Sequence, residues 1–223
     1  MASEPLAPDT EAPPVSPEAD PTKRGGALAS LARLADSVRR LVDRVISLDA
    51  PSGALDPVAD SLDALTDALV PWHGRRPIPA WSGTVDRSDP NAFLPWSPMI
   101  GRYNPLAPPI ELTIEGDTVV GRARFGAAYE GPPGCVHGAI VAGAFDQVLA
   151  LVNVLVGHPA MTGTLTIKYR RPTPLHEELR FVARTDRVEG RKVFASATLH
   201  AGETLVAESE GVFILVTAMP AVP

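Results

Sequence analysis

The sequence predicts an α+β fold in which one antiparallel sheet wraps around a single long helix, with a helical extension on the N-terminal side. Two segments of alternating apolar and polar residues precede a proline-free apolar block at 138–156. Four further strand-like segments follow it, and we expect them to form an antiparallel meander. A helix that is apolar on nearly every side must be covered on nearly every side. One curved sheet is the simplest cover, so we expect this helix at the centre of the main domain.

The first 26 residues are expected to be a disordered tail. Residues 1–22 carry six prolines, five carboxylates and no aromatic side chain. Such a segment cannot bury enough apolar surface to offset its ordering entropy. It also lacks the apolar stretch of a signal peptide.

Residues 27–71 are expected to form two amphipathic helices. Apolar residues recur at spacings of three and four from Leu28 to Val45, and the first helix ends before Pro51. In the second helix we expect Asp56 to be the N-cap and Pro71 to end the helix. The arginine content leaves a DNA-binding headpiece open. A helical hairpin that packs on the main domain or on a partner chain is the simpler interpretation.

The rest of the chain divides into a strap and the main domain. Residues 72–104 are rich in proline, show little periodicity and predict an extended strap over the domain surface. The main domain spans residues 105–217. Its predicted strands are residues 110–115, 119–125, 162–169, 179–188, 192–199 and 204–216, with tight turns at Gly116-Asp117, Gly190 and Gly202.

Composition excludes several classes of protein. A formal net charge of −6 argues against a nucleic-acid binder, because phosphate contacts need a basic surface. The single cysteine, Cys135, permits no internal disulfide and no Cys-X-X-Cys metal site, so we expect a reducing, cytoplasmic environment and neither metal nor other cofactor. We also expect no membrane-spanning helix, which would need about 18 apolar residues.

The segment Gly131-Pro-Pro-Gly-Cys-Val-His137-Gly138 has the chemistry of an oxyanion site. Proline and glycine bring the chain in as a rigid loop, and the central helix starts at or just after His137. The free N–H groups of a helix start attract negative charge, and Gly138 allows a ligand to approach them. A histidine here is also a common capping or core residue. A Cys135–His137 nucleophile pair has no third residue to orient it.

Asp146 is the only ionisable residue between Gly138 and Val156. An unpaired carboxylate on an apolar helix is costly to bury, and such carboxylates often mark functional sites. A structural aspartate that is hydrogen-bonded to a neighbouring strand remains the alternative. His137 precedes Asp146 by nine residues, or 2.5 helical turns, so the two side chains should point to opposite sides of the helix.

Basic residues gather at two strand ends. Lys168, Arg170 and Arg171 surround Tyr169, and Arg191-Lys192 follow the Gly190 turn. Strand alternation places Lys168 and Arg170 on one face. They are either a site for nucleotide phosphates or ordinary solvated strand ends.

Over residues 105–217 the chain resembles the hotdog-fold acyl-CoA thioesterases of the phenylacetate-pathway and mitochondrial long-chain types. The loop that ends in His137-Gly138, with Asp146 at the family's spacing, is similar to the family's His-Gly-Gly loop and helical acid. The segment from Thr162 to Pro172 is similar to its central strand and proline turn, and the segment from Val188 to Phe194 to its next hairpin. Two positions differ: Ala139 replaces the family's second glycine, and Gly131 stands where many members have asparagine.

The resemblance implies roles for particular residues. Asp146 corresponds to the general base or nucleophile, Gly138 to the oxyanion-hole donor, His137 to the residue that positions the thioester, and Thr162 to the residue that orients water. Lys168, Arg170, Arg191 and Lys192 correspond to positions that contact coenzyme A. The family's active site lies across a dimer interface, so the resemblance implies a homodimer or a dimer of dimers.

The sequence therefore predicts hydrolysis of acyl-CoA to the free acid and coenzyme A. One alternative is a hotdog protein that senses or carries acyl-CoA without turnover. Another is an enoyl-thioester hydratase, but the sequence does not show the acid–histidine arrangement that such an enzyme needs.

Overall fold

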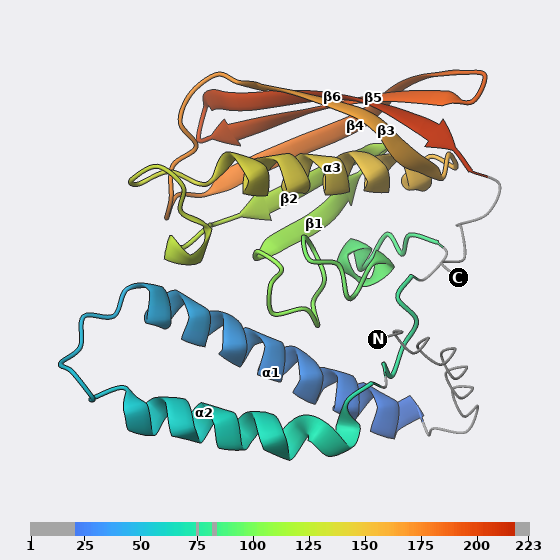
Figure 1. Cartoon of the computed structure of the whole chain (residues 1–223). Coiled ribbons are helices and arrows are strands. Elements are labelled where there is room, and N and C mark those ends of the chain that lie inside the picture. Colours follow the sequence, from blue (N-terminus) through green and yellow to red (C-terminus); the bar gives the residue numbers. More distant parts are fainter. Residues whose placement is uncertain (1–20, 75, 82–83, 217–223) are drawn as a thin grey trace, which may run out of the picture.

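A computed structural model describes residues 21–74, 76–81 and 84–216 (Figure 1). Six antiparallel strands form one sheet in the order β1-β2-β4-β5-β6-β3. The strands are β1 (Ile110–Glu115), β2 (Thr118–Ala123), β3 (Ala160–Tyr169), β4 (Leu179–Glu189), β5 (Lys192–Ala201) and β6 (Thr204–Leu215). Together with the central helix α3 (Gly138–Leu155), this sheet confirms the predicted α+β hotdog fold.

The strand order contains one feature that the alternation pattern did not reveal. The last four strands were expected to form a meander, but β3 does not pair with β4, which follows it in the chain. It pairs with β6 instead, and so becomes one of the two edge strands. The helix α3 lies antiparallel to β3, because residues early in α3 contact residues late in β3 and the reverse.

The core lies between the concave face of the sheet and α3. Strand β5 alternates buried and half-buried residues, so that Val193, Ala195, Ala197 and Leu199 all point inward. The ring of Phe145 on α3 meets the ring of Phe181 on β4 edge-on, with centroids 5.4 Å apart. Burial of these apolar side chains is the main force that holds the helix on the sheet.

The expectation that no helix could span a membrane was wrong in one respect. By length and composition α3 qualifies, because its 18 residues carry a single charge. Half of this stretch is buried inside the domain, and Asn153 and Gln147 are among its buried residues. Its apolar character is that of a core helix that the sheet surrounds.

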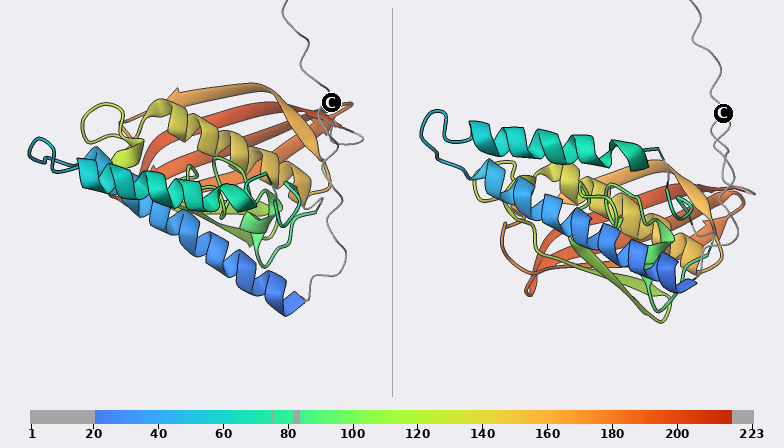
Figure 2. Two further views of the ribbon diagram at one scale, coloured as in Figure 1. Left: turned by 60° about the horizontal axis from the view of Figure 1, so that its bottom comes forward. Right: turned by 90° about the horizontal axis from the view of Figure 1, so that it is seen from below.

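The N-terminal residues form a helical hairpin below the hotdog unit (Figures 1 and 2). Helix α1 (Pro21–Ile46) begins before the expected start at Ala27, so residues 21–26 are helical; residues 1–20 of the predicted tail lie outside the described residues. Helix α2 spans Asp56–Leu69. Asp56 is its first helical residue and not its N-cap, a position that Leu55 occupies.

The two helices differ in how they contact the rest of the chain. In α1, Ala35 is fully buried, whereas no residue of α2 is buried. The apolar residues of α2 and of the 3-10 helix η1 (Val70–Trp72) are largely open to solvent: Leu65 is 63% exposed and Trp72 is 71% exposed. Among the described residues of these two helices, therefore, only α1 buries a residue.

The predicted strap lies across α3. Between Trp72 and Ile110 the described residues contain one 3-10 helix, η2 (Pro90–Phe93), and no strand. The side chain of Met99 lies against Gly143 of α3, where an added Cβ would be 2.8 Å from its terminal methyl carbon. The Ser97 hydroxyl donates a hydrogen bond of 2.9 Å to Oε1 of Gln147. The strap therefore covers part of the flank of α3 that the sheet leaves open.

Candidate active site

The loop before α3 is a tightly closed turn. It follows the 3-10 helix η3 (Ala127–Tyr129), and Oε1 of Glu130 accepts a hydrogen bond of 2.7 Å from the N–H of Gly134. An added Cβ at Gly131 would lie only 2.8 Å from Cα of His137. In this chain the loop therefore has no space for a side chain at the position where many thioesterases carry asparagine.

His137 is the N-cap of α3. Its Nδ1 accepts a hydrogen bond of 3.0 Å from the N–H of Ala139, and its carbonyl oxygen accepts from Ile140 and Val141. For the N–H of Gly138 no partner is found among the described residues. Among the described residues, one unpaired backbone donor is thus left at the positive end of the helix dipole, where the sequence predicted free N–H groups.

Tyr169, at the end of β3, lies over this first helical turn. Its hydroxyl donates a hydrogen bond of 2.8 Å to the carbonyl oxygen of Gly138. A Cβ at Gly138 would be 3.5 Å from the tyrosine ring, which is ordinary van der Waals contact. Burial raises the pKa of the Tyr169 phenol. Sequence reasoning did not assign Tyr169 to the site, although its place between Lys168 and Arg170 was a usable signal.

Asp146 lies further along α3, on the flank that faces the start of β3. Its Oδ1 accepts a hydrogen bond of 2.7 Å from the hydroxyl of Thr162. The aspartate is partly exposed, so it does not suffer the full cost of a buried charge. Strand β3 has a register shift between Thr162 and Thr164, and this irregularity lies beside the carboxylate.

The structure separates the two predicted catalytic positions within one chain. Eight residues divide Gly138 from Asp146, which is about 12 Å along a helix. Gly138 lies beside the end of β3 and Asp146 beside its start. No contact joins His137 to Asp146 in the described residues, in agreement with their predicted divergence. One thioester carbonyl cannot touch both positions of the same chain.

The four residues proposed to contact coenzyme A form two separate pairs. Lys168 pairs with Glu208 on β6 at 3.8 Å and with Glu210 at 3.4 Å, and Arg170 also pairs with Glu208. Arg191 and Lys192 lie at the other end of the sheet, where Lys192 is level with Ile214 of β6. Within one chain, therefore, these four residues do not form one cluster.

Arg171 is better placed than sequence reasoning recognised. A groove of about 410 Å³ runs beside Gly138, and Tyr169, Arg170, Arg171 and Cys135 line it. No ion pair of Arg171 is found within the described part of the chain, whereas Arg170 pairs with Glu208. The Cys135 thiol is directed to the carbonyl oxygen of Pro133 and not to His137. Among the described residues, no three His, Cys, Asp or Glu side chains gather as a metal site.

Comparison with known proteins places this arrangement in a family. A family model described as thioesterase superfamily matches residues 133–208. A crystal structure of a thioesterase superfamily protein has 32% sequence identity and a TM-score of 0.72, and covers 82% of this chain and 90% of that chain. The chain belongs to the thioesterase superfamily.

Two curated relatives are each similar to less than half of this chain. Acyl-coenzyme A thioesterase THEM4 of Xenopus laevis is 30% identical over 95 residues, which are 43% of each chain. Acyl-coenzyme A thioesterase THEM5 of Homo sapiens is 30% identical over 91 residues, which are 40% of this chain and 37% of that one. The chain therefore matches less than half the length of these relatives.

Proposed function

We propose that this chain hydrolyses acyl-CoA thioesters to the free acid and coenzyme A. The observation that carries the proposal is the pairing of Asp146, the only ionisable side chain of α3, with the Thr162 hydroxyl at 2.7 Å on a partly exposed flank. Membership of the thioesterase superfamily and similarity to curated acyl-coenzyme A thioesterases support it.

The proposed chemistry divides between the two ends of the site. The thioester carbonyl oxygen points at the free Gly138 N–H, which stabilises the negative charge that develops when the carbonyl carbon is attacked. Asp146 either takes a proton from the attacking water or attacks the carbon itself. Thr162 holds the carboxylate in position. The carbon–sulfur bond breaks, and water supplies the oxygen of the acid and the proton of the thiol.

We propose that the complete site contains Gly138 of one copy and Asp146 of a second copy. Strand β3 is an edge strand with mostly exposed residues, so its outer side is open for pairing. Antiparallel pairing of two β3 strands would bring the Tyr169 end of β3 in one copy towards the Thr162 end of β3 in the other. The Gly138 end of one chain and the Asp146 end of the other would then face one substrate.

The same pairing accounts for the divided basic residues. Lys168, Arg170 and Arg171 lie at the Gly138 end of one chain, and Arg191 and Lys192 lie at the Asp146 end. Two copies would bring both groups to one site, where their cations attract the phosphates of coenzyme A. The apolar acyl chain would then lie along α3.

The decisive experiment is thiol release from a panel of short, long and aryl acyl-CoAs. Asp146→Asn is expected to lower kcat on the order of 10²–10⁴, the usual contribution of a positioned acid–base group. Asp117→Asn, an equal change in the exposed β1–β2 turn, is the matched control and should keep full activity. Unchanged kcat in a folded Asp146→Asn protein would refute the assignment. Tight acyl-CoA binding without thiol release by the wild type would identify a binding protein instead.

The two-copy site has a test of its own. Asp146→Asn and Gly138→Pro each remove one half of the site, and each alone is expected to keep only the small residual kcat given for that variant. In a mixture that exchanges subunits, a mixed dimer keeps one intact site, so activity should reappear. If mass spectrometry shows that mixed dimers have formed and activity does not return, the two halves act within one chain and the proposal is wrong.

A further inference from the structure

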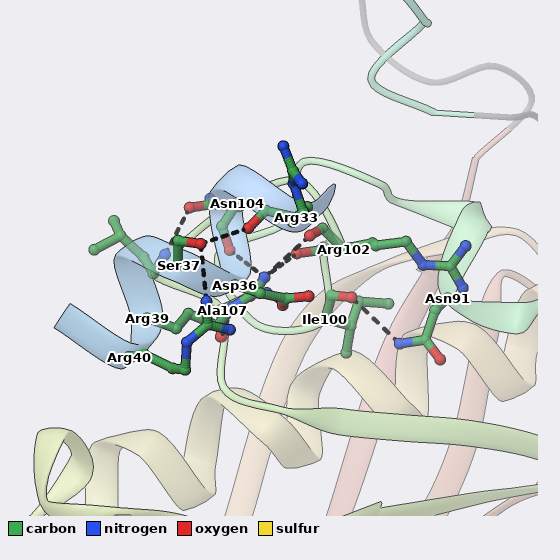
Figure 3. Close-up of polar contacts among 12 residues, drawn as sticks. Arg33, Asp36, Ser37, Arg39, Arg40, Asn91, Ile100, Arg102, Asn104 and Ala107 are labelled. Atoms are coloured by element: carbon green, nitrogen blue, oxygen red, sulfur yellow. Dashed lines mark hydrogen bonds and ion pairs between the residues drawn. The ribbon is translucent and has the colours of Figure 1, made fainter. Parts of the chain in front are cut away.

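The side chain of Arg39 on α1, outside residues 133–208 that the family model matches, makes an unusual set of contacts. Its Nη2 donates to the carbonyl oxygens of Gly101 at 3.1 Å, Arg102 at 3.1 Å and Asn104 at 2.7 Å (Figure 3). Its Nε donates to the carbonyl of Ala107 at 3.1 Å, and Nη1 pairs with Asp36. The side chain is only 19% exposed. One guanidinium therefore holds three backbone carbonyls at the end of the strap and that of Ala107 at the start of the main domain.

The Ala107 carbonyl connects the Arg39 side chain to the loop before α3. It also accepts a hydrogen bond of 3.2 Å from the hydroxyl of Tyr129, the last residue of η3. The backbone oxygen of Tyr129 in turn accepts a hydrogen bond of 2.8 Å from the N–H of His137. The ring of Tyr129 stacks edge-on against buried Phe125, with centroids 5.5 Å apart. A continuous chain of contacts thus runs from Arg39 to the residue that precedes Gly138.

The segment that Arg39 holds also contacts α3 near Asp146, at the other end of the site. The segment 97–107, which contains the end of the strap, begins with Ser97, whose hydroxyl donates a hydrogen bond to Gln147, the neighbour of Asp146. Met99 packs on Gly143, one helical turn before Gln147. Arg39 therefore holds a segment that touches α3 near Asp146 and, through Tyr129, the backbone near Gly138.

We propose that Arg39 is a positioning residue for the site: through the Ala107 carbonyl and Tyr129 it fixes the backbone of His137 and Gly138. The inference rests on the proposed function for its catalytic consequence. A guanidinium suits this role because it is a rigid, planar cation that presents five N–H donors. A shift of an oxyanion donor by about 1 Å is enough to slow a reaction by as much as 10²-fold.

Three variants test the inference. Arg39→Met keeps an unbranched, mainly apolar stem and removes the guanidinium with all its donors. Tyr129→Phe removes only the hydroxyl and keeps the ring contact with Phe125. Arg40→Met is the matched control: this neighbouring side chain is exposed, and its hydrogen bond among the described residues goes to Ser37 of the same helix.

The first readout is steady-state kinetics on an acyl-CoA that the wild type hydrolyses. Arg39→Met and Tyr129→Phe should each lower kcat about 10-fold, less than the 10²–10³ expected for loss of an oxyanion donor itself. KM should stay within about twofold, because substrate contacts remain. Arg40→Met should match the wild type. Unchanged kcat in both test variants would overturn the inference.

The second readout needs no activity and separates this inference from the proposed function. Amide hydrogen exchange should accelerate over residues 127–139 in both test variants, with the strands β5 and β6 unchanged. If Arg39→Met accelerates exchange throughout the fold, the result for Tyr129→Phe alone tests the inference. Unchanged exchange over residues 127–139 would refute the inference. If the wild type releases no thiol while exchange still responds, the proposed function fails and the positioning contact stands.

Discussion

The hydroxyl of Thr162 donates a hydrogen bond of 2.7 Å to the carboxylate of Asp146, which joins the edge strand β3 to the middle of α3. This contact is what a structural aspartate needs, and it is equally what a catalytic carboxylate needs to be held in one orientation. The partial exposure of Asp146 favours the second role, since a purely structural carboxylate gains nothing from an open flank.

Substitution of Thr162 separates these roles. Thr162→Val removes the donor at nearly constant volume, and we expect kcat for thioester hydrolysis to fall about 10-fold, below the effect of losing an acid–base group itself. Thr162→Ser keeps the hydroxyl and should recover most of the activity. A fall in the melting temperature without a change in kcat would instead mark the contact as structural.

Deletion of one backbone donor is possible at Gly138. Proline suits the first position of a helix, and the extended backbone of His137, with ψ at 132°, is compatible with a following proline. Gly138→Pro should therefore fold and lower kcat by about 10²–10³, the usual cost of losing an oxyanion donor. Gly138→Ala keeps the N–H, has space beside Tyr169 and is the matched control. Equal activity of the two variants would exclude Gly138 as the donor.

Arg171 should contribute more to coenzyme A binding than Arg170. Arg170 already pairs with Glu208, whereas Arg171 lines the groove beside Gly138 without an ion pair in the described residues. Arg171→Ala should raise KM for acyl-CoA about 10-fold, the cost of about one charge-assisted hydrogen bond. KM for a thioester of the same acid that lacks phosphates should not change. A similar rise for both substrates would place Arg171 at the acyl group instead.

Two tyrosines, Tyr129 and Tyr169, should ionise at a higher pH than a tyrosine in the unfolded chain. Burial raises the pKa of Tyr129 above its ordinary value of 10.0, with smaller opposed effects of Arg39 and Asp43, and burial likewise raises the pKa of Tyr169. A folded-state pKa above the unfolded value stabilises the fold fully below pH 10, and this contribution disappears as the pH rises through the folded pKa. Near-ultraviolet titration should show phenolate at higher pH in the wild type than in the unfolded chain. Tyr169→Phe should remove one late component, and a phenolate signal from Tyr169 below pH 10 would contradict the expectation.

Elements that depend on neighbours in the chain were predictable from residue patterns. The start of α3 just after His137 follows from a Pro/Gly loop that leads into an apolar block, and the turns at Gly190 and Gly202 both have positive φ, of 59° and 55°. The divergence of His137 from Asp146 follows from helix geometry alone. These features are decided within a few residues, so local sequence contains enough information to predict them.

Other features depend on segments that are distant in the chain. The pairing of β3 with β6, the pairing of Arg170 with Glu208 and the reach of Arg39 to the Ala107 carbonyl, 68 residues away, have no local signal. For this reason the sequence favoured Lys168 and Arg170 over Arg171, and it assigned no site role to Tyr169. For the arginines of the N-terminal helices it indicated only a DNA-binding headpiece, not a contact with the strap. Residue periodicity specifies which face of an element is apolar, but burial summed over the whole chain decides which faces meet. The hotdog unit could therefore be predicted from sequence, whereas the contacts that hold its site in place required the tertiary structure.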